Sequence, residues 1–190
     1  MDLRLTWDLF ILVFFAIIIA YSFILGKDAT LKIILGTYAS SLAADAAGNI
    51  VGARFGASTE LLKATSNIGL VGEKDTAIFI KIAIFVTFLI ILTIKGSFSV
   101  EAHGGKTSGM KVFFTGIYGF LSAALIVSTI LMYVSGISFI TGSLQPGLAS
   151  ITVFSGQSPF VQKMLDYYNV WFLLPVLAMI IGSFLNEDEA

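Results

Sequence analysis

The chain lacks cysteine altogether, contains a single histidine, and has charged side chains at only 12% of its 190 positions. Disulfides, thiolate nucleophiles and Cys/His zinc clusters are therefore excluded, although Asp and Glu could still bind a hard cation. Eleven Lys and Arg stand against twelve Asp and Glu, so no basic field exists to hold nucleic acid. These absences exclude disulfide-stapled, zinc-binding and nucleic-acid-binding proteins.

Recognisable catalytic motifs are also missing. The sequence contains no Gly-x-Ser-x-Gly elbow, no His-Glu-x-x-His, and no complete Gly-x-x-x-x-Gly-Lys-Ser/Thr phosphate loop. The single histidine, His103, lies with Glu101 in the Gly- and Ser-rich polar stretch 96–109. A solvated role is favoured for it, because no second His or Cys completes a metal site. The sequence therefore predicts no enzyme activity, no catalytic residue, no cofactor and no metal site.

Hydrophobic residues make up 57% of the chain and the mean hydropathy is +0.94, whereas an ordinary soluble domain has about 25% charged residues. The composition indicates a membrane protein. A bilayer core about 30 Å thick requires about 20 largely apolar residues per helix. Four runs of this kind are predicted to span, at 7–25, 30–54, 76–94 and 111–136. A cleaved signal peptide is the alternative for the first run, but no small-x-small cleavage site follows it closely.

The carboxy-terminal part predicts two further helices. Residues 159–168 begin at Pro159 and carry apolar residues on one face, which is typical of an amphipathic helix lying in the interface. Residues 169–185 are apolar with Pro175 inside, and we favour a fifth crossing over a kinked helix that stays in one leaflet. The expected fold is an all-α membrane protein, a single domain over 1–190, with four to five transmembrane helices and a carboxy-terminal amphipathic helix.

The second run differs from the others because it is rich in small residues. Small side chains recur at every fourth position, at Gly36, Ser40, Ala44, Gly48, Gly52 and Gly56. On a helix this spacing draws a groove where another backbone approaches closely, so we favour a packing seam over a pore or substrate groove. The run is predicted to be central in the bundle, with Ala44 and Gly48 at the closest approach. The fourth run also has a small face, which includes Gly116 and Gly119.

Two charged residues fall inside the predicted spans. Asp45 lies thirteen residues beyond Lys32, about 20 Å along a helix, and Lys81 lies five residues beyond Thr76, about 7.5 Å in from the opposite face. In a core about 30 Å thick, Asp45 is left about 10 Å from that same opposite face, so the depths of the two residues match. A lone charge in hydrocarbon is costly, so each residue is the nearest candidate partner of the other. The alternatives are that Lys81 snorkels to the interface and that the second helix ends early, which would leave Asp45 exposed to water.

Orientation depends on the basic residues beside the spans. Five basic residues lie on each side of the predicted spans, namely Arg4, Arg54, Lys63, Lys74 and Lys163 on the amino-terminal side and Lys27, Lys32, Lys95, Lys106 and Lys111 on the other. The equal numbers do not decide the orientation, but the second group is concentrated in two short connections. Because the positive-inside rule acts most strongly there, we expect these two hairpin tips in the cytoplasm and the amino terminus outside.

A family resemblance enters at the fourth run. Residues 118–127 read YGFLSAALIV and follow Gly116. This stretch resembles the fourth-helix pattern of the colicin V production protein (CvpA) family, and the other segments follow that family's order over nearly the whole chain. The resemblance implies a multi-pass protein of the bacterial inner membrane, linked to toxin export or envelope homeostasis. It implies no catalytic residues.

Two functions are open at this point. The first is a non-enzymatic membrane scaffold or accessory protein, whose partners are membrane lipids and either another membrane protein or a second copy of the chain. The second is a small transporter or channel subunit in which Asp45 and Lys81 are the working charges. A scaffold should tolerate Asp45→Asn with Lys81→Met, whereas an ion-coupled carrier should not.

Overall fold

A computed structural model describes residues 7–55, 73–96, 108–135, 138–140 and 159–187. Over these residues the chain contains α-helices and no strands, which confirms the all-α prediction for the described part. The helices are α1 (Trp7–Leu25), α2 (Lys27–Phe55), α4 (Glu73–Lys95), α5 (Ser108–Val134), α7 (Pro159–Asp166) and α8 (Tyr168–Glu187). Each predicted run corresponds to one of these helices.

Two described helices are long and apolar enough to cross a membrane, through Ile78–Lys95 of α4 and Gly109–Val134 of α5. The pair α7 and α8, bent by 65° at their junction, adds a third if it forms one broken span. The apolar part of α1 is shorter, and α2 is diluted by Ala, Gly, Ser and Thr. Membrane association is therefore indicated, while the larger number of spans expected from the sequence stays a prediction.

The turn between α1 and α2 consists of one residue, Gly26. Its φ is +84°, a left-handed conformation that glycine adopts without a steric cost. Its N–H donates to the Ser22 carbonyl at 2.9 Å, while its own carbonyl accepts from the backbone N–H and the hydroxyl of Thr30. The end of α1 and the start of α2 thus share one compact turn, and α2 begins three residues earlier than the sequence predicted.

Gly26→Ala is expected to lower the free energy of unfolding by roughly 1–2 kcal/mol, the usual cost of a left-handed conformation for a residue with a Cβ. A Cβ at position 26 meets no atom within 4 Å, so the cost comes from the backbone alone. Denaturation in detergent micelles measures it. Gly109→Ala is the matched control, because its Cβ also meets nothing within 4 Å and its φ is not positive. Equal stability of the two variants would contradict the prediction.

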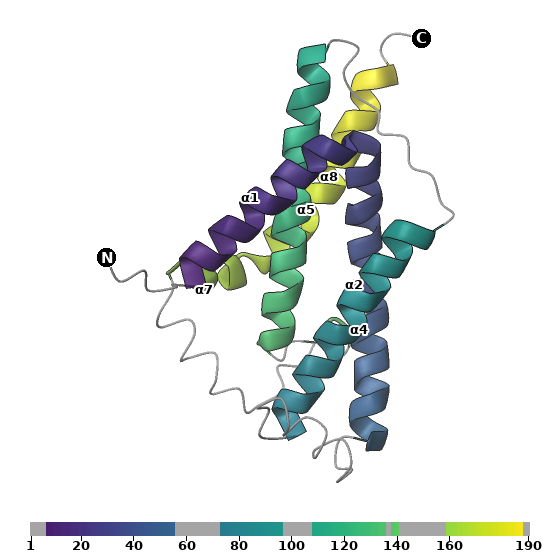
Figure 1. Ribbon diagram of the computed structural model, residues 1–190, viewed down its shortest axis with the longest axis vertical. Coiled ribbons are helices and arrows are strands. Elements are labelled where there is room, and N and C mark those ends of the chain that lie inside the picture. The colour runs from purple at the N-terminus through teal and green to yellow at the C-terminus, as the bar shows by residue number, and fades with distance from the viewer. Residues whose placement is uncertain (1–6, 56–72, 97–107, 136–137, 141–158, 188–190) are drawn as a thin grey trace.

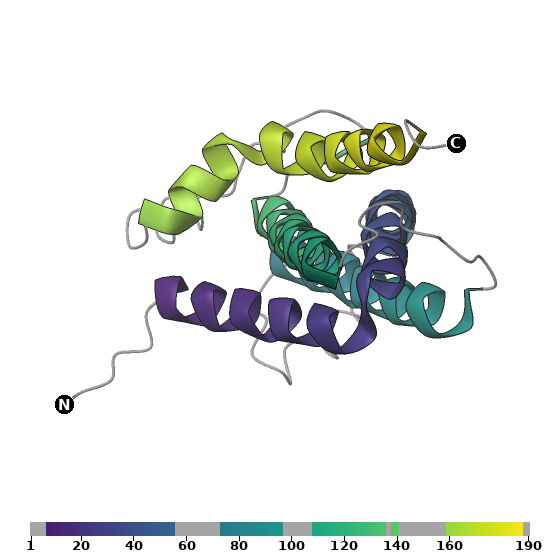
Figure 2. The same cartoon turned by 90° about the horizontal axis from the view of Figure 1, so that it is seen from above.

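Helix α5, and not α2, is the centre of the described structure. It contacts each of the other described helices, and α1 and α8 lie on opposite sides of it (Figure 2). Helix α2 packs mainly against α4 and α5, as the ribbon also shows (Figure 1). The prediction that the second run is central was wrong, because small residues mark close approach without requiring partners all around. Leu42 and Ile50 of α2 stay exposed.

Three clusters of buried apolar residues explain why α5 is central, since each of them includes α5. The first joins it to α1 and α7 and the third joins it to α2 and α4. The second contains residues of α2, and α8 packs against it. The core residues of the three clusters on α5 are Tyr118, Leu121, Ala123, Ala124, Leu125, Ile126, Val127 and Tyr133.

The short helix α7 has the amphipathic pattern that the sequence predicted. Val161 and Met164 are buried against α1 and α5, while Gln162, Lys163 and Asp166 are exposed. The helix ends where the chain bends into α8. Its apolar side is therefore used for packing within the chain.

Candidate functional site

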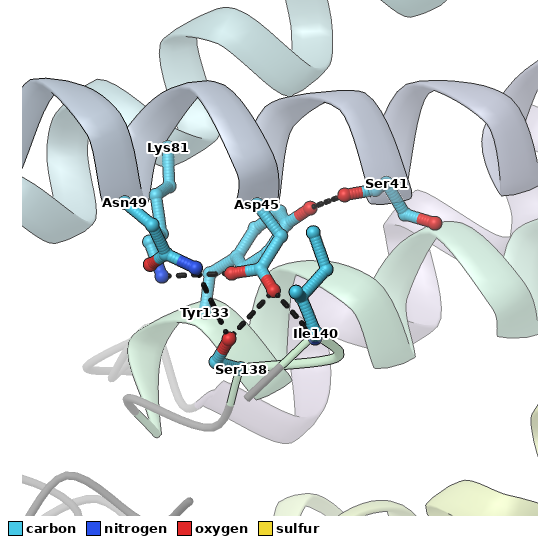
Figure 3. Close-up of polar contacts among 7 residues, drawn as sticks. All are labelled: Ser41, Asp45, Asn49, Lys81, Tyr133, Ser138 and Ile140. Carbon is cyan, nitrogen blue, oxygen red and sulfur yellow. Dashed lines mark hydrogen bonds and ion pairs between the residues drawn. The ribbon is translucent and has the colours of Figure 1, made fainter. Parts of the chain in front are cut away.

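An ion pair between α2 and α4 is the most distinctive polar feature of the described residues. Lys81 Nζ lies 2.8 Å from Asp45 Oδ1. The Asp45 side chain is completely buried and that of Lys81 is 12% exposed. Figure 3 shows the two side chains converging from neighbouring helices. The residues that the sequence pairs by depth therefore lie in contact.

The second oxygen of the Asp45 carboxylate is bound by residues far away in the sequence. Ser138 Oγ donates to Oδ2 at 2.7 Å and the backbone N–H of Ile140 donates to the same atom at 3.0 Å. Asn49 Nδ2 in turn donates to Ser138 Oγ at 3.3 Å. We call residues 138–140 the strap. They lie beside α2 at Asp45 (Figure 3), so one carboxylate binds α4 through one oxygen and the strap through the other.

Gly48 makes room for the lysine side chain. A Cβ built at this position would lie 2.3 Å from Cγ of Lys81 and within 3.2 Å of Cδ and Cε. The aliphatic stem of Lys81 therefore lies directly on the α2 backbone, one turn after Asp45. The predicted close backbone approach at Gly48 is corrected here, because the atoms that fill its groove belong to a side chain. The glycine permits the lysine to reach the carboxylate.

Aromatic rings surround the ion pair on the side of α5 and α8. The hydroxyl of Tyr133 donates to the Ser41 carbonyl at 2.6 Å, and its ring lies 5.9 Å from that of Phe85 and 6.0 Å from that of Phe139. Phe139 of the strap also contacts Phe172 of α8, with ring centroids 5.0 Å apart. This apolar surrounding lowers the local dielectric and strengthens the interaction between the two charges.

The other small residues singled out from the sequence have separate roles. Ser40 and Ala44 are buried within the helix contacts of α2, and a Cβ at Gly36 would make only ordinary contacts, the nearest at 3.6 Å to Leu89. Gly52 lies in α2, and Gly56 falls outside the described residues.

Helices α1 and α5 approach each other closely at two glycines of α5. A Cβ at Gly119 would be 2.9 Å from Cβ of Ser22 and 3.5 Å from Cα of Ile19, and one at Gly116 would be 3.4 Å from the Phe23 ring. The close backbone approach expected of the small ladder on α2 is therefore found at Gly119 instead.

The site does not resemble a metal centre. Over the described ranges no three His, Asp or Glu side chains converge on a point where an ion could bind, and His103 lies outside them. The groups around Asp45 are an ammonium, a hydroxyl and an N–H, all of which donate to it. A cation could bind the carboxylate only by displacing Lys81. The arrangement is suited to holding helices together.

Sequence reasoning missed Ser138 and Ile140. The stretch after Gly136 is rich in Ser, Thr and Gly, but this composition does not single out Ser138, and a backbone N–H donor such as that of Ile140 leaves no trace in residue type. Comparison of the chain with family models, with characterised proteins and with solved structures found no match.

Proposed function

We propose that this chain is a non-enzymatic scaffold or accessory protein of the bacterial inner membrane, similar to the colicin V production protein family, with four or five transmembrane helices. The observation that carries the proposal is the pairing of Asp45, whose buried carboxylate accepts from Lys81, Ser138 and Ile140. A carrier site must release its charge to a substrate, whereas a packing site keeps it paired. The satisfied pair favours a role in assembly.

The outer surface supports the same proposal. Apolar side chains are exposed along α4, including Phe79, Phe88, Ile90, Ile91 and Ile94. Exposed apolar faces of this extent are typical of contact with lipid or with other membrane helices. Membrane lipids and either another membrane protein or a second copy of the chain are the partners we propose.

The proposed orientation places the connections after α1 and after α4 in the cytoplasm. Lys32 Nζ donates to the Gly96 carbonyl at 2.7 Å, which holds the start of α2 beside the end of α4. Lys27 and Lys95 therefore belong to the same end of the structure. Basic residues gathered beside spans favour the cytoplasmic side.

A small carrier is the second candidate. The observation in its favour is an Asp–Lys pair inside the predicted spans, with Asp45 about 20 Å along α2 from Lys32, at a depth where ionisable residues commonly mark ion or proton pathways.

Proteoliposomes distinguish the two candidates. The purified chain is reconstituted with a pH-sensitive dye inside the vesicles, and a proton gradient and a membrane potential are applied. A scaffold is expected to give proton flux equal to that of empty vesicles. Flux above this background that disappears in the Asp45→Asn/Lys81→Met variant would overturn the scaffold proposal and establish the carrier.

A complementary measurement addresses assembly directly. Because the chain has no native cysteine, Ile90→Cys on the exposed face of α4 can be cross-linked in intact membranes, with Lys163→Cys on the polar face of α7 as the control. A scaffold is expected to give a discrete cross-linked species from position 90 that persists in the Asp45→Asn/Lys81→Met background. Its absence at position 90, or its loss in that background, would count against the proposal.

A further inference from the structure

Asp45 connects α4 to the strap through charged and hydrogen-bonding groups. One carboxylate oxygen receives Lys81 of α4, and the other receives both donors from the strap. The two interactions share one rigid planar group, so the orientation that suits Lys81 also presents the second oxygen to Ser138 and Ile140. Movement of the lysine therefore alters what the strap is bound to.

The strap is in turn joined to α8. Phe139 lies with its ring 5.0 Å from Phe172 and 6.0 Å from Tyr133. The Phe172 carbonyl accepts a hydrogen bond from the Tyr38 hydroxyl of α2. A contiguous series of contacts thus leads from α4 through Lys81, Asp45 and the strap to α8.

We propose that Asp45 couples the position of α4 to the attachment of the strap, so that the strap stays bound to the Asp45 carboxylate only while Lys81 is seated on Gly48 and paired with that carboxylate. This device goes beyond the proposed scaffold role and does not depend on it. Of the two helices long and apolar enough to span, α4 is much the more exposed, so a change in the molecules that cover its outer face would be transmitted inward through Lys81.

The charge state explains why the coupling is strong. Hydrogen bonds to a charged acceptor are about twice as strong as neutral ones. Without the ammonium, two neutral donors do not compensate a buried carboxylate, so Asp45 takes up a proton or draws in water. Either outcome weakens its bonds to Ser138 and Ile140. Tyr133 is the other titratable group beside the site among the described residues, and its hydroxyl is engaged with the Ser41 carbonyl.

Hydrogen–deuterium exchange at the Ile140 amide tests the proposal, because that N–H donates directly to Asp45. The full chain is measured in nanodiscs by mass spectrometry with fragmentation to residue resolution. In Lys81→Met we expect exchange at Ile140 to accelerate at least about tenfold, while amides in the buried part of α5 stay protected. Asp45→Asn/Lys81→Met is expected to restore slow exchange, because the neutral amide oxygen still accepts from the strap and no charge is left uncompensated.

A second variant keeps both charged groups. Gly48→Ala places a Cβ against Cγ of Lys81, so the lysine leaves the carboxylate and exchange at Ile140 accelerates in the same way. Gly36→Ala, which meets no close contact, is the matched control and should leave it unchanged. If Ile140 exchanges at the wild-type rate in Gly48→Ala with α5 still protected, the coupling does not exist. The same conclusion follows if the double neutral variant exchanges as fast as Lys81→Met.

Discussion

Replacing Lys81 with Met is expected to lower the free energy of unfolding by about 3–5 kcal/mol, because it leaves the Asp45 carboxylate buried and uncompensated. The Asp45 side chain is completely buried and loses the ammonium partner that the described residues provide. An exposed ion pair would contribute only about 0–1 kcal/mol. Met retains the aliphatic stem over Gly48, so the loss comes from the charge and not from packing. Equilibrium denaturation in mixed detergent micelles gives the value.

The double variant Asp45→Asn/Lys81→Met is expected to recover most of that loss. Asn is nearly isosteric with Asp, its amide oxygen can still accept from Ser138 and Ile140, and neither buried charge remains. Removing both members of a buried pair is often close to neutral, whereas removing one is not. The resulting double-mutant cycle measures the coupling between the two residues.

Lys163→Met serves as the matched control for the cycle. Lys163 lies on the exposed face of α7, where a surface substitution changes stability by only about 0.5 kcal/mol or less. If Lys81→Met costs no more than this control, Asp45 is stabilised by its other partners and the ion pair is dispensable. If the double variant is as unstable as Lys81→Met, the loss does not come from the unpaired charge.

An interaction of this site could be predicted from the sequence only where it depends on the type of a residue. Asp45 and Lys81 were paired because ionisable residues are rare in apolar runs, and helical rise converts their positions into depths. The run 7–25 coincides with α1 because charged and glycine residues end it sharply. Both inferences use one-dimensional information that the sequence contains directly.

The strap was beyond this kind of reasoning. Ser138 is 93 residues from Asp45 along the chain, and the Ile140 donor is a backbone group that every residue except proline possesses. The central place of α5 was missed for a related reason. Small residues on α2 show where a neighbour approaches. The burial of α5 results instead from apolar side chains contributed by α1, α2, α4 and α7, with α8 packed alongside. No local sequence pattern of α5 indicates which helices contribute these side chains.

Gly48 and Gly36 lie on the same small-residue ladder of α2, yet their alanine variants are expected to change stability in opposite directions. Gly48→Ala should lower the free energy of unfolding by about 1–3 kcal/mol through overpacking alone, because the new Cβ falls 2.3 Å from Cγ of Lys81, and the loss of the pairing with Asp45 adds to this cost. That atom is near the base of the side chain, so moving the ammonium end alone does not relieve the clash and the whole lysine side chain must be displaced. Gly36→Ala meets only ordinary contacts and should gain roughly 0.5–1 kcal/mol, the usual benefit of replacing a helical glycine.

The cost at Gly48 should disappear when the lysine stem is removed. In an Asp45→Asn/Lys81→Ala background no side chain passes over residue 48, so adding Gly48→Ala is expected to be neutral or slightly stabilising in the same micelle denaturation. Such non-additivity is expected when two residues occupy one space. If Gly48→Ala keeps its full cost in that background, the glycine is needed for close contact with another backbone, as the spacing of small residues on α2 predicts. If the cost vanishes, Gly48 is present so that a lysine on one helix can reach a carboxylate on the next.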